Sequence, residues 1–216
     1  MQIPHIAVII IIAANVIISM KGFNDLSFFE KYKFNVAGIR RGEQIRMFSS
    51  AFLHADFSHL LFNMLTLYFF ADVVIDQVGV MYFVIIYVAS LLAGNLLAFY
   101  FHKDEPHYSA IGASGAVMGI LYSAILFYPD MSLFIFFIPI PIPAWLFGMA
   151  YLLYSIYGMK NRVGNIGHDA HIGGAVGGYV LTLLFAPILF QSSLWIVILL
   201  AVPLIILFIM HKAGKL

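Results

Sequence analysis

Three short clusters of polar and small residues interrupt an otherwise apolar chain, and their residue types could carry out nucleophilic catalysis. Ser114 lies in the second cluster and His171 in the third. A serine hydroxyl is a weak nucleophile until a neighbouring base accepts its proton, and histidine is the usual base. The first cluster contains His59 and Asn63, and their i, i+4 spacing puts them on one face of a helix. These side chains predict a nucleophile, a base and hydrogen-bond donors beside them.

The composition indicates the surroundings in which this chemistry would take place. Of the 216 residues, 63% are hydrophobic and only 10% are charged, and the mean hydropathy is +0.99. A soluble domain carries roughly 25% charged residues, so we expect lipid to solvate this chain. The net charge of +1, without a basic stripe, argues against nucleic acid as a partner. Because there is no cysteine, disulfides, thiol nucleophiles and cysteine-based metal sites are excluded.

Seven apolar segments approach the length of about 20 residues that a helix needs to cross a bilayer. They are residues 3–20, 59–75, 80–101, 112–128, 143–157, 170–191 and 194–210. The first segment has neither a basic stretch before it nor a small-residue cleavage site after it, so we expect a retained helix. The sequence therefore predicts an all-α membrane protein. Residues 1–191 would form a six-helix core, and residues 192–216 an additional C-terminal transmembrane helix with a short tail.

Two connections between the predicted spans have unusual compositions. Residues 21–58 contain six of the eleven Lys and Arg residues together with many Phe, Ile and Met residues, which indicates a lobe lying at the membrane interface. The segment 131–143 contains Pro139, Pro141 and Pro143 at alternate positions. Proline at this density excludes a helix, so we expect an extended connector into the fifth span.

The three polar clusters are expected at one depth in the membrane. Each lies near the N-terminal end of its span, and the second, fourth and sixth spans run parallel because consecutive spans alternate in direction. Gly115 and Gly119 form a small-residue pair on the fourth span, and Gly174 and Gly178 form another on the sixth. Such pairs allow two helix backbones to approach closely, which would bring the short side chain of Ser114 within reach of the histidine.

An oxyanion site is predicted beside the nucleophile. Ser114 would stand at a helix N-terminus, where backbone N–H groups lack partners and the helix dipole favours negative charge. The imidazole of His59 and the amide of Asn63 could add two side-chain donors. One such donor is typically worth about 3 kcal/mol of transition-state stabilisation.

Taken together, these motifs resemble those of rhomboid-family intramembrane serine proteases. The resemblance rests on the segments HADFSHLLFN (54–63), GASG (112–115) and AHIGGAVGG (170–178), with Arg46 before the first and IPIPIPAW before the fifth span. It implies a rhomboid-like six-helix core with one further helix. It also implies cleavage of transmembrane segments of other proteins through an acyl-enzyme, by a Ser114–His171 dyad that needs no metal or other cofactor.

The resemblance also assigns roles around the dyad. His59, Asn63 and the backbone of Ser114 would form the oxyanion hole, and Gly112 and Gly115 would shape the approach to the serine. His54 would be structural and would hold the interfacial lobe. Met118 stands where the family often has a tyrosine that stacks on the catalytic histidine, and a thioether can pack on an imidazole as well.

Structural interpretations compete with these roles. Taken alone, Ser114 would be a small packing residue at a helix crossing, and His59 with Asn63 a hydrogen-bonded pair at a helix end. His168 is expected to be structural. Gly174 and Gly178, three and seven residues after His171, lie on the same helix face as His171, so His171 is the better candidate for the base. Asp169 precedes His171 by two residues and we assign it no place in a triad.

Two other functions and the membrane orientation remain open at this point. The chain could be an inactive relative that binds membrane clients, or a transporter lined by histidines. With seven spans, all eleven Lys and Arg residues fall on the side of the long loop, which the positive-inside rule puts in the cytoplasm. The resemblance instead implies an active site that opens to the extracytoplasmic side of a cell membrane, and we expect this orientation. The oligomeric state is not predicted.

Overall fold

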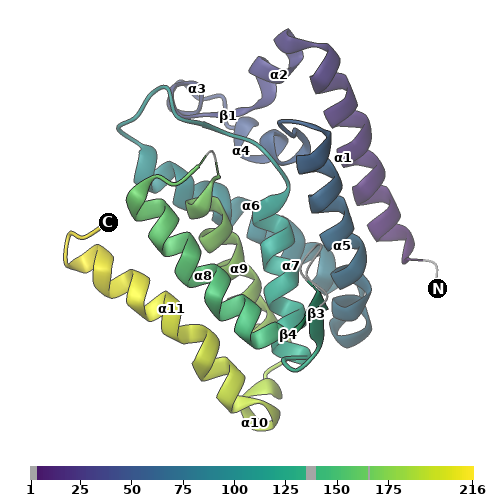
Figure 1. Cartoon of the computed structure of the whole chain (residues 1–216). Helices are drawn as coiled ribbons and strands as arrows, with labels where there is room; N and C mark the ends of the chain where they lie inside the picture. The colour runs from purple at the N-terminus through teal and green to yellow at the C-terminus, as the bar shows by residue number, and fades with distance from the viewer. Residues whose placement is uncertain (1–3, 135–139, 165) are drawn as a thin grey trace.

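The computed structural model describes residues 4–134, 140–164 and 166–216, and seven long helices dominate this part of the chain (Figure 1). They are α1 (Ile6–Asn24), α5 (Phe57–Val78), α6 (Val80–His102), α7 (Ser114–Phe127), α8 (Ala144–Asn161), α9 (His168–Phe185) and α11 (Leu194–Lys212). Each predicted span corresponds to one of these helices. The all-α fold class is therefore confirmed.

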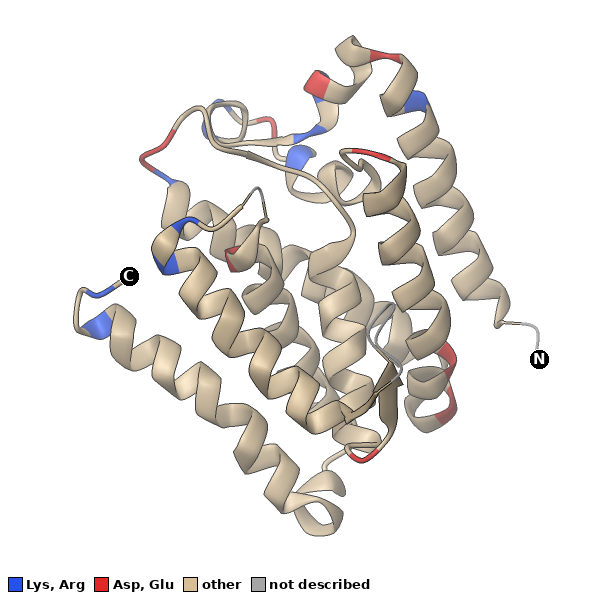
Figure 2. Ribbon diagram, viewed as in Figure 1, with Lys and Arg blue, Asp and Glu red and all other residues tan. Residues whose placement is uncertain are grey.

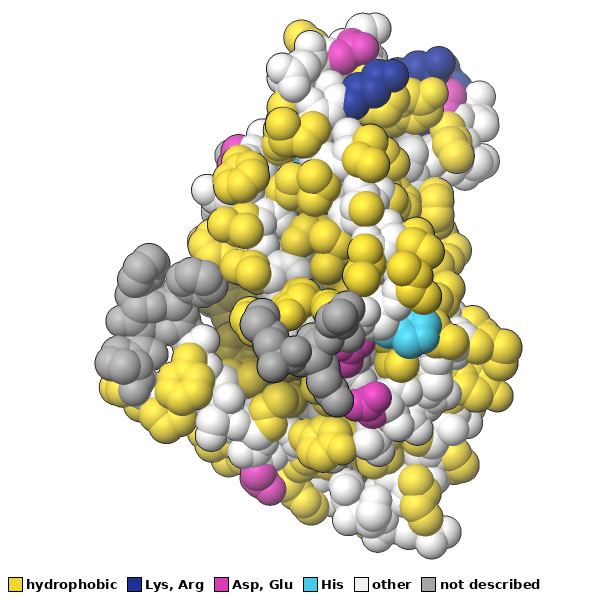
Figure 3. Space-filling model, turned by 90° about the vertical axis from the view of Figure 1, so that its right-hand side faces the viewer, with side chains coloured by type: hydrophobic (Ala, Val, Ile, Leu, Met, Phe, Trp, Pro, Cys, Tyr) yellow, Lys and Arg dark blue, Asp and Glu magenta, His cyan; other side chains and the backbone are white. Residues whose placement is uncertain are grey.

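The outer surface of this bundle suits a lipid environment. By length and composition alone, α1, α5, α6 and α11 could each cross a membrane. On the face formed by α1 and α5, hydrophobic side chains form a broad band, and Lys and Arg appear only near one end (Figure 3). Ile10, Ile17 and Phe69 are among the many large apolar side chains that are more than half exposed. The chain is thus an integral, multi-pass membrane protein.

The helix α7 forms the centre of the bundle. Every residue from Gly115 to Leu126 is buried, as expected for a helix that is apolar on all sides. Its 14 residues span only about 21 Å, at about 1.5 Å per residue, whereas the hydrocarbon layer is about 30 Å thick. Because α7 is shorter than the layer, its first residue, Ser114, lies below the membrane surface when its other end reaches the opposite surface.

Glycines let α9 lie directly against α7. A Cβ at Gly174 would collide with the carbonyl oxygen of Gly115, and a Cβ at Gly178 with that of Gly119. The two small-residue pairs that the sequence showed therefore face each other across the α7–α9 interface. These contacts bring the backbones together at two points about one turn apart.

The sixth span ends earlier than predicted. Residues 170–191 were expected in one helix, but α9 ends at Phe185 and a separate short helix, α10 (Leu189–Ser192), follows before α11. Pro187 explains the break, because it lacks an N–H donor and disfavours helix at the residue before it. The proposed division of the chain between residues 191 and 192 falls within α10, and this division stays a proposal.

The long first connection folds into a lobe above the N-terminal ends of α5 and α7 (Figure 1). Its elements are α2 (Leu26–Tyr32), β1 (Phe34–Asn35), α3 (Val36–Arg40), α4 (Arg46–Ser49) and the 3₁₀ turn η1 (Ser50–Phe52). Strand β1 pairs in antiparallel fashion with β2 (Ser109–Ala110), in the loop before α7. This pairing fixes the lobe to the segment that leads to Ser114.

Arg46 holds the lobe together from inside. Its Nε lies 2.5 Å from Oε2 of Glu43, and its Nη1 donates to the carbonyl oxygens of Glu30 and Lys33 at 2.8 and 2.9 Å. The side chain is only 11% exposed. The hydrogen bond from Arg46 holds the pKa of the Glu43 carboxyl below its usual value.

His54 connects the lobe with α1 and with the loop before α7. The backbone N–H of Ala113 donates to its Nε2 at 3.4 Å, so Nδ1 carries the proton and donates to Oγ of Ser19 at 2.8 Å. The Ser19 hydroxyl in turn donates to the carbonyl oxygen of Phe52 at 2.9 Å. Burial lowers the pKa of His54 to about 3, so the ring is neutral and every polar atom is paired.

The described parts of the connector into the fifth span, residues 131–134 and 140–143, contain extended strands, as predicted. Strands β3 (Ser132–Phe134) and β4 (Pro141–Pro143) form a short antiparallel hairpin, and α8 follows at once. Pro139 lies outside the described residues.

Charged residues are distributed unequally between the two ends of the bundle. Lys and Arg gather at the end that carries the lobe and the C-terminus, whereas the opposite end carries acidic residues (Figure 2). This is the distribution that the alternation of seven spans predicted.

Candidate active site

The nucleophile and base candidates meet where α7 and α9 begin. Ser114 is the first residue of α7, and His171 lies in the first turn of α9. Although 57 residues separate them in the chain, Oγ of Ser114 and Nε2 of His171 lie 2.7 Å apart. This is hydrogen-bonding distance, the geometry that proton transfer from serine to histidine requires.

Gly112 shapes the approach to the serine. Its φ of +116° is a backbone conformation that side chains rarely adopt, and its N–H donates to the carbonyl oxygen of Ser50 at 3.0 Å. A Cβ here would come within 2.8 Å of the His59 ring and 3.8 Å of Oγ of Ser114. Only glycine therefore leaves the space between this histidine and the serine open.

The oxyanion-hole candidates on α5 present free donors to the same space. Asn63 is 7% exposed, and its Nδ2 has no hydrogen-bond partner among the residues that the structure describes. The backbone N–H of Ala55 donates to Nδ1 of His59 at 3.4 Å, so the ring proton is on Nε2, the atom beside Gly112. The first backbone N–H groups of α7, including that of Ser114, lack partners within the helix as well.

A cavity of about 920 Å³ brings these groups together. Ser114, His171, His59 and Asn63 all line it, and so does Gly112. The cavity is large enough for an extended stretch of a peptide and for water. The candidate nucleophile, base and donors thus face one common space.

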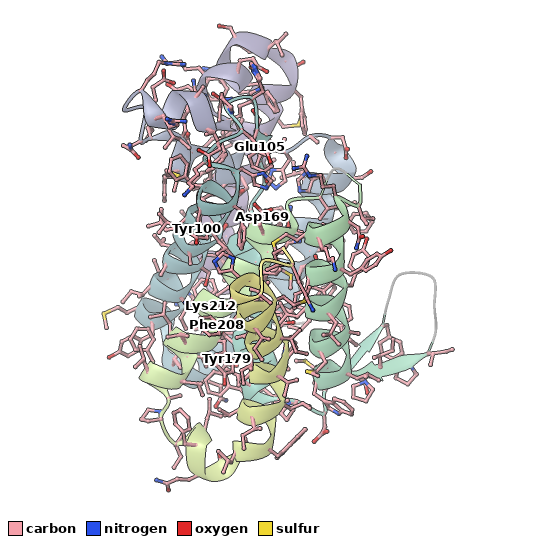
Figure 4. The ribbon with its side chains drawn as sticks, turned by 90° about the vertical axis from the view of Figure 1, so that its left-hand side faces the viewer. Tyr100, Glu105, Asp169, Tyr179, Phe208 and Lys212 are labelled. Carbon is pink, nitrogen blue, oxygen red and sulfur yellow. The ribbon has the colours of Figure 1, made fainter. Side chains whose placement is uncertain are left out.

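Neighbours of the base in the sequence have other partners. Asp169, which is labelled in Figure 4, accepts a hydrogen bond from the Tyr108 hydroxyl, at 3.4 and 3.3 Å, and its Oδ2 lies 3.2 Å from Nε2 of His102. His168 is buried, and its Nε2 lies 3.2 Å from the carbonyl oxygen of Val163. Both contacts connect α9 with the loops around it, in keeping with the structural interpretation.

The sequence pattern does not indicate one polar neighbour of the candidate base. The hydroxyl of Tyr151, on α8, lies 2.7 Å from Nδ1 of His171. Met118, which stands where the family often has a tyrosine, is buried in the core cluster that contains Tyr122 and also lines the cavity. Nothing in the sequence distinguishes Tyr151 from Tyr154 and Tyr157, which follow it on the same helix.

Within the described ranges, no three or more His, Asp and Glu side chains are grouped so that they could hold a metal ion. The family resemblance implies that no metal or other cofactor is needed, and this stays a prediction.

Comparisons with known proteins agree with the motifs. The sequence model of the family described as the Rhomboid domain matches residues 41–188. RHOMBOID-like protein 12, mitochondrial, of Arabidopsis thaliana is 28% identical over 182 residues, which are 77% of this chain and 54% of that protein. Rhomboid protein 1, mitochondrial, of Saccharomyces cerevisiae is 31% identical over 138 residues, 62% of this chain and 40% of that protein. Rhomboid protease GluP of Bacillus subtilis is 30% identical over 141 residues, 65% of this chain and 26% of that protein.

The chain spans about half, or less, of the length of these relatives. The family match nevertheless covers well over half of the chain and includes all three motifs, from His54 to Gly178. The chain belongs to the rhomboid family.

Proposed function

We propose that this protein is an intramembrane serine endopeptidase that cleaves transmembrane segments of other membrane proteins. The observation that carries the proposal is the 2.7 Å distance between Oγ of Ser114 and Nε2 of His171 inside a cavity. A serine used only for packing would not need an imidazole at its hydroxyl, nor free donors around it. Membership in a family that includes a protein named as a protease gives independent support.

The first half of the reaction forms an acyl-enzyme. Oγ of Ser114 attacks the carbonyl carbon of the scissile peptide bond, while Nε2 of His171 accepts the hydroxyl proton. The negative charge that develops on the carbonyl oxygen is met by the side chains of His59 and Asn63 and by the backbone N–H of Ser114. The imidazolium then gives its proton to the leaving nitrogen as the C–N bond breaks, and the amine product departs.

The second half releases the other product. A water molecule loses a proton to Nε2 of His171 and attacks the ester carbonyl. The same donors stabilise the second oxyanion. When the C–O bond breaks, the proton passes to Oγ of Ser114, and the free serine and neutral histidine are restored.

Cleavage of a transmembrane reporter in detergent, with a metal chelator present, tests this function. We expect the wild-type chain to cut the reporter and to react with a fluorophosphonate probe. Ser114→Ala should do neither, whereas Ser192→Ala, which changes an exposed hydroxyl at the end of α10, should do both. If Ser114→Ala cuts as fast as the wild type, the proposed mechanism is wrong.

The same experiment separates protease from client-binding protein. An inactive relative would hold the reporter without cutting it, and would bind it equally well with Ser114 or Ala at this position. A chain that binds but never cuts would thus overturn the proposal in favour of that alternative. A histidine-lined transporter would show neither reporter cleavage nor modification of Ser114.

We further propose that the cavity opens to the extracytoplasmic side. Several cations on this side are held by the folded lobe, including Arg46 with Glu43 and Lys33 with Glu30, so their position serves folding as well as insertion. Single cysteines at Asn24 and Lys160, in a chain that has none, should react with an impermeant reagent on intact cells. Protection of both cysteines would show that the cavity opens to the opposite side.

The expected location in a cell membrane is not supported by the relatives that are named as mitochondrial.

A further inference from the structure

The proposed general base has a second polar contact, and it comes from a different helix. Nδ1 of His171 lies 2.7 Å from the hydroxyl of Tyr151 on α8, while Nε2 lies 2.7 Å from Oγ of Ser114 on α7. No other hydrogen-bond partner of either ring nitrogen is found within the described residues. The imidazole is therefore held from both sides, at its two nitrogens.

The two contacts restrict each other, because a neutral imidazole carries one proton. If the proton is on Nε2, this nitrogen donates to Ser114 and cannot accept the hydroxyl proton. If it is on Nδ1, that nitrogen donates to Oη of Tyr151 and Nε2 keeps a free lone pair for the serine. Which nitrogen is protonated is set by the hydrogen bond at the other one. In serine proteases with a triad, a carboxylate sets it.

Asp169 does not supply that carboxylate. Its oxygens lie against Tyr108 and His102, on the side of the α6 terminus. The position of a triad acid is taken by a phenol oxygen, which accepts a hydrogen bond through a lone pair and can donate its own proton to water in the cavity that it lines.

We propose that Tyr151 is a positioning residue for the reaction, which accepts a hydrogen bond from Nδ1–H of His171 and so keeps Nε2 free to take the proton of Ser114. This proposal rests on the proposed function. The Tyr151 hydroxyl contacts the proposed base, so its effect is exerted through the orientation and protonation state of His171.

The packing of α8 places the hydroxyl with the required accuracy. The Tyr122 hydroxyl of α7 donates to the carbonyl oxygen of Gly148, one turn before Tyr151. A Cβ at Gly158 would collide with the His168 ring, so this glycine lets the other end of α8 approach α9. The Phe147 ring stacks on the Tyr151 ring at 5.8 Å between centroids. Because the orienting hydroxyl belongs to α8 and the dyad to α7 and α9, a displacement of α8 breaks the contact with the base.

The first test reads the ring proton directly and needs no substrate. Two-bond ¹H–¹⁵N correlation spectra of histidine-labelled protein, at about pH 8 where ordinary imidazoles are neutral, distinguish the protonated ring nitrogen from the free one. His171→Gln identifies the signals. We expect the proton of wild-type His171 on Nδ1, and in Tyr151→Phe we expect population to move to Nε2. Tyr154→Phe, which changes an exposed tyrosine of the same helix, should leave the spectrum of His171 as in the wild type.

The second test measures cleavage of the transmembrane reporter. Tyr151→Phe keeps the ring, so KM should stay unchanged while kcat falls about tenfold, less than the roughly 10⁴-fold loss when a triad loses its orienting charge. Tyr154→Phe should keep both constants.

The two measurements separate this proposal from the proposed function. A wild-type proton on Nε2 overturns the role of Tyr151, whether or not the chain cleaves the reporter. Equal spectra and equal kcat in wild type and Tyr151→Phe overturn it too. If the proton is on Nδ1 and moves in the variant but the wild type does not cleave, the proposed function is wrong, while the control of the His171 ring proton by Tyr151 is still shown.

Discussion

Gly174 of α9 packs directly on the carbonyl oxygen of Gly115 of α7, with no side chain between the two backbones. Gly115 follows Ser114 in the chain, and Gly174 lies one turn after His171. The contact between the glycines therefore sets the distance between the two side chains that carry the proposed chemistry. The packing of α9 on α7 therefore also positions the candidate site.

Gly174→Ala should destabilise the protein and separate the dyad. The added methyl group would overlap a backbone oxygen, which cannot rotate away, so α9 must move off α7. Overpacking of this kind costs about 1–3 kcal/mol. We expect the melting temperature in detergent to fall by several degrees and the reaction of Ser114 with a fluorophosphonate to slow strongly.

Gly167→Ala is the matched control for this substitution. Gly167 has an ordinary φ of −74°, and a Cβ there would meet only the Cβ of Ala170 at 3.7 Å, a normal contact. Its melting temperature should stay close to that of the wild type. Equal stability of Gly174→Ala and the wild type would mean that the helices are not in contact as described.

Asn63→Ala should impair catalysis without impairing the fold. Nδ2 of Asn63 is buried and has no partner within the described residues, so the fold gains no hydrogen bond from it. Removing an unsatisfied buried donor is neutral or stabilising. Loss of one oxyanion donor typically lowers kcat by about 10²–10³-fold. We expect a loss of this order in reporter cleavage, with an unchanged or raised melting temperature.

The exposed amide of Asn161, which donates to the carbonyl oxygen of Tyr157 at the end of α8, offers a control. Asn161→Ala should cleave the reporter like the wild type. Should Asn63→Ala keep full activity, Asn63 has no part in the oxyanion hole.

The sequence predicted the helices and the dyad partners better than it predicted the surroundings of the base. Spans are readable because each must be long and apolar, and Ser114 and His171 stand at matched ends of parallel spans, beside glycines. Tyr151 could not be found in this way, because its contact with His171 depends on the rotation of α8, which no local pattern specifies. The break after Phe185 could have been read from Pro187, but the apolar run to residue 191 concealed it.

Arg46→Ala should loosen the lobe. The side chain is 11% exposed and donates to the carbonyl oxygens of Glu30 and Lys33, which would lose their partner. Hydrogen bonds to charged groups contribute about 1.5–3 kcal/mol each. We expect a clear fall in melting temperature and faster proteolysis of residues 21–58 by added trypsin. Arg46→Lys should not restore stability, because an ammonium lacks the planar fork of donors.

Arg41 provides the comparison within the same lobe. It pairs with Glu43 at 3.2 Å, but its side chain is 65% exposed. Exposed pairs contribute little, so Arg41→Ala should melt close to the wild-type temperature. A larger effect at Arg41 than at Arg46 would contradict the role given to the buried arginine.

His54 should make the protein less stable as the pH falls below about 6.5, the ordinary value for histidine. Burial lowers its pKa to about 3 in the folded state. Between these two values the unfolded chain binds a proton that the folded chain does not, so the free energy of unfolding decreases as the pH decreases. Glu43, whose pKa is lowered as well, acts in the same direction only at lower pH.

Melting temperatures of wild type and His54→Gln between about pH 8 and pH 5 isolate the contribution of the histidine. Only the wild type should show that contribution to the dependence of stability on pH. Ser19→Ala removes the partner of Nδ1 but leaves His54 buried, so this variant should melt earlier at every pH and keep the slope. A wild-type slope no steeper than that of His54→Gln would show that His54 is not held neutral between the lobe and α7.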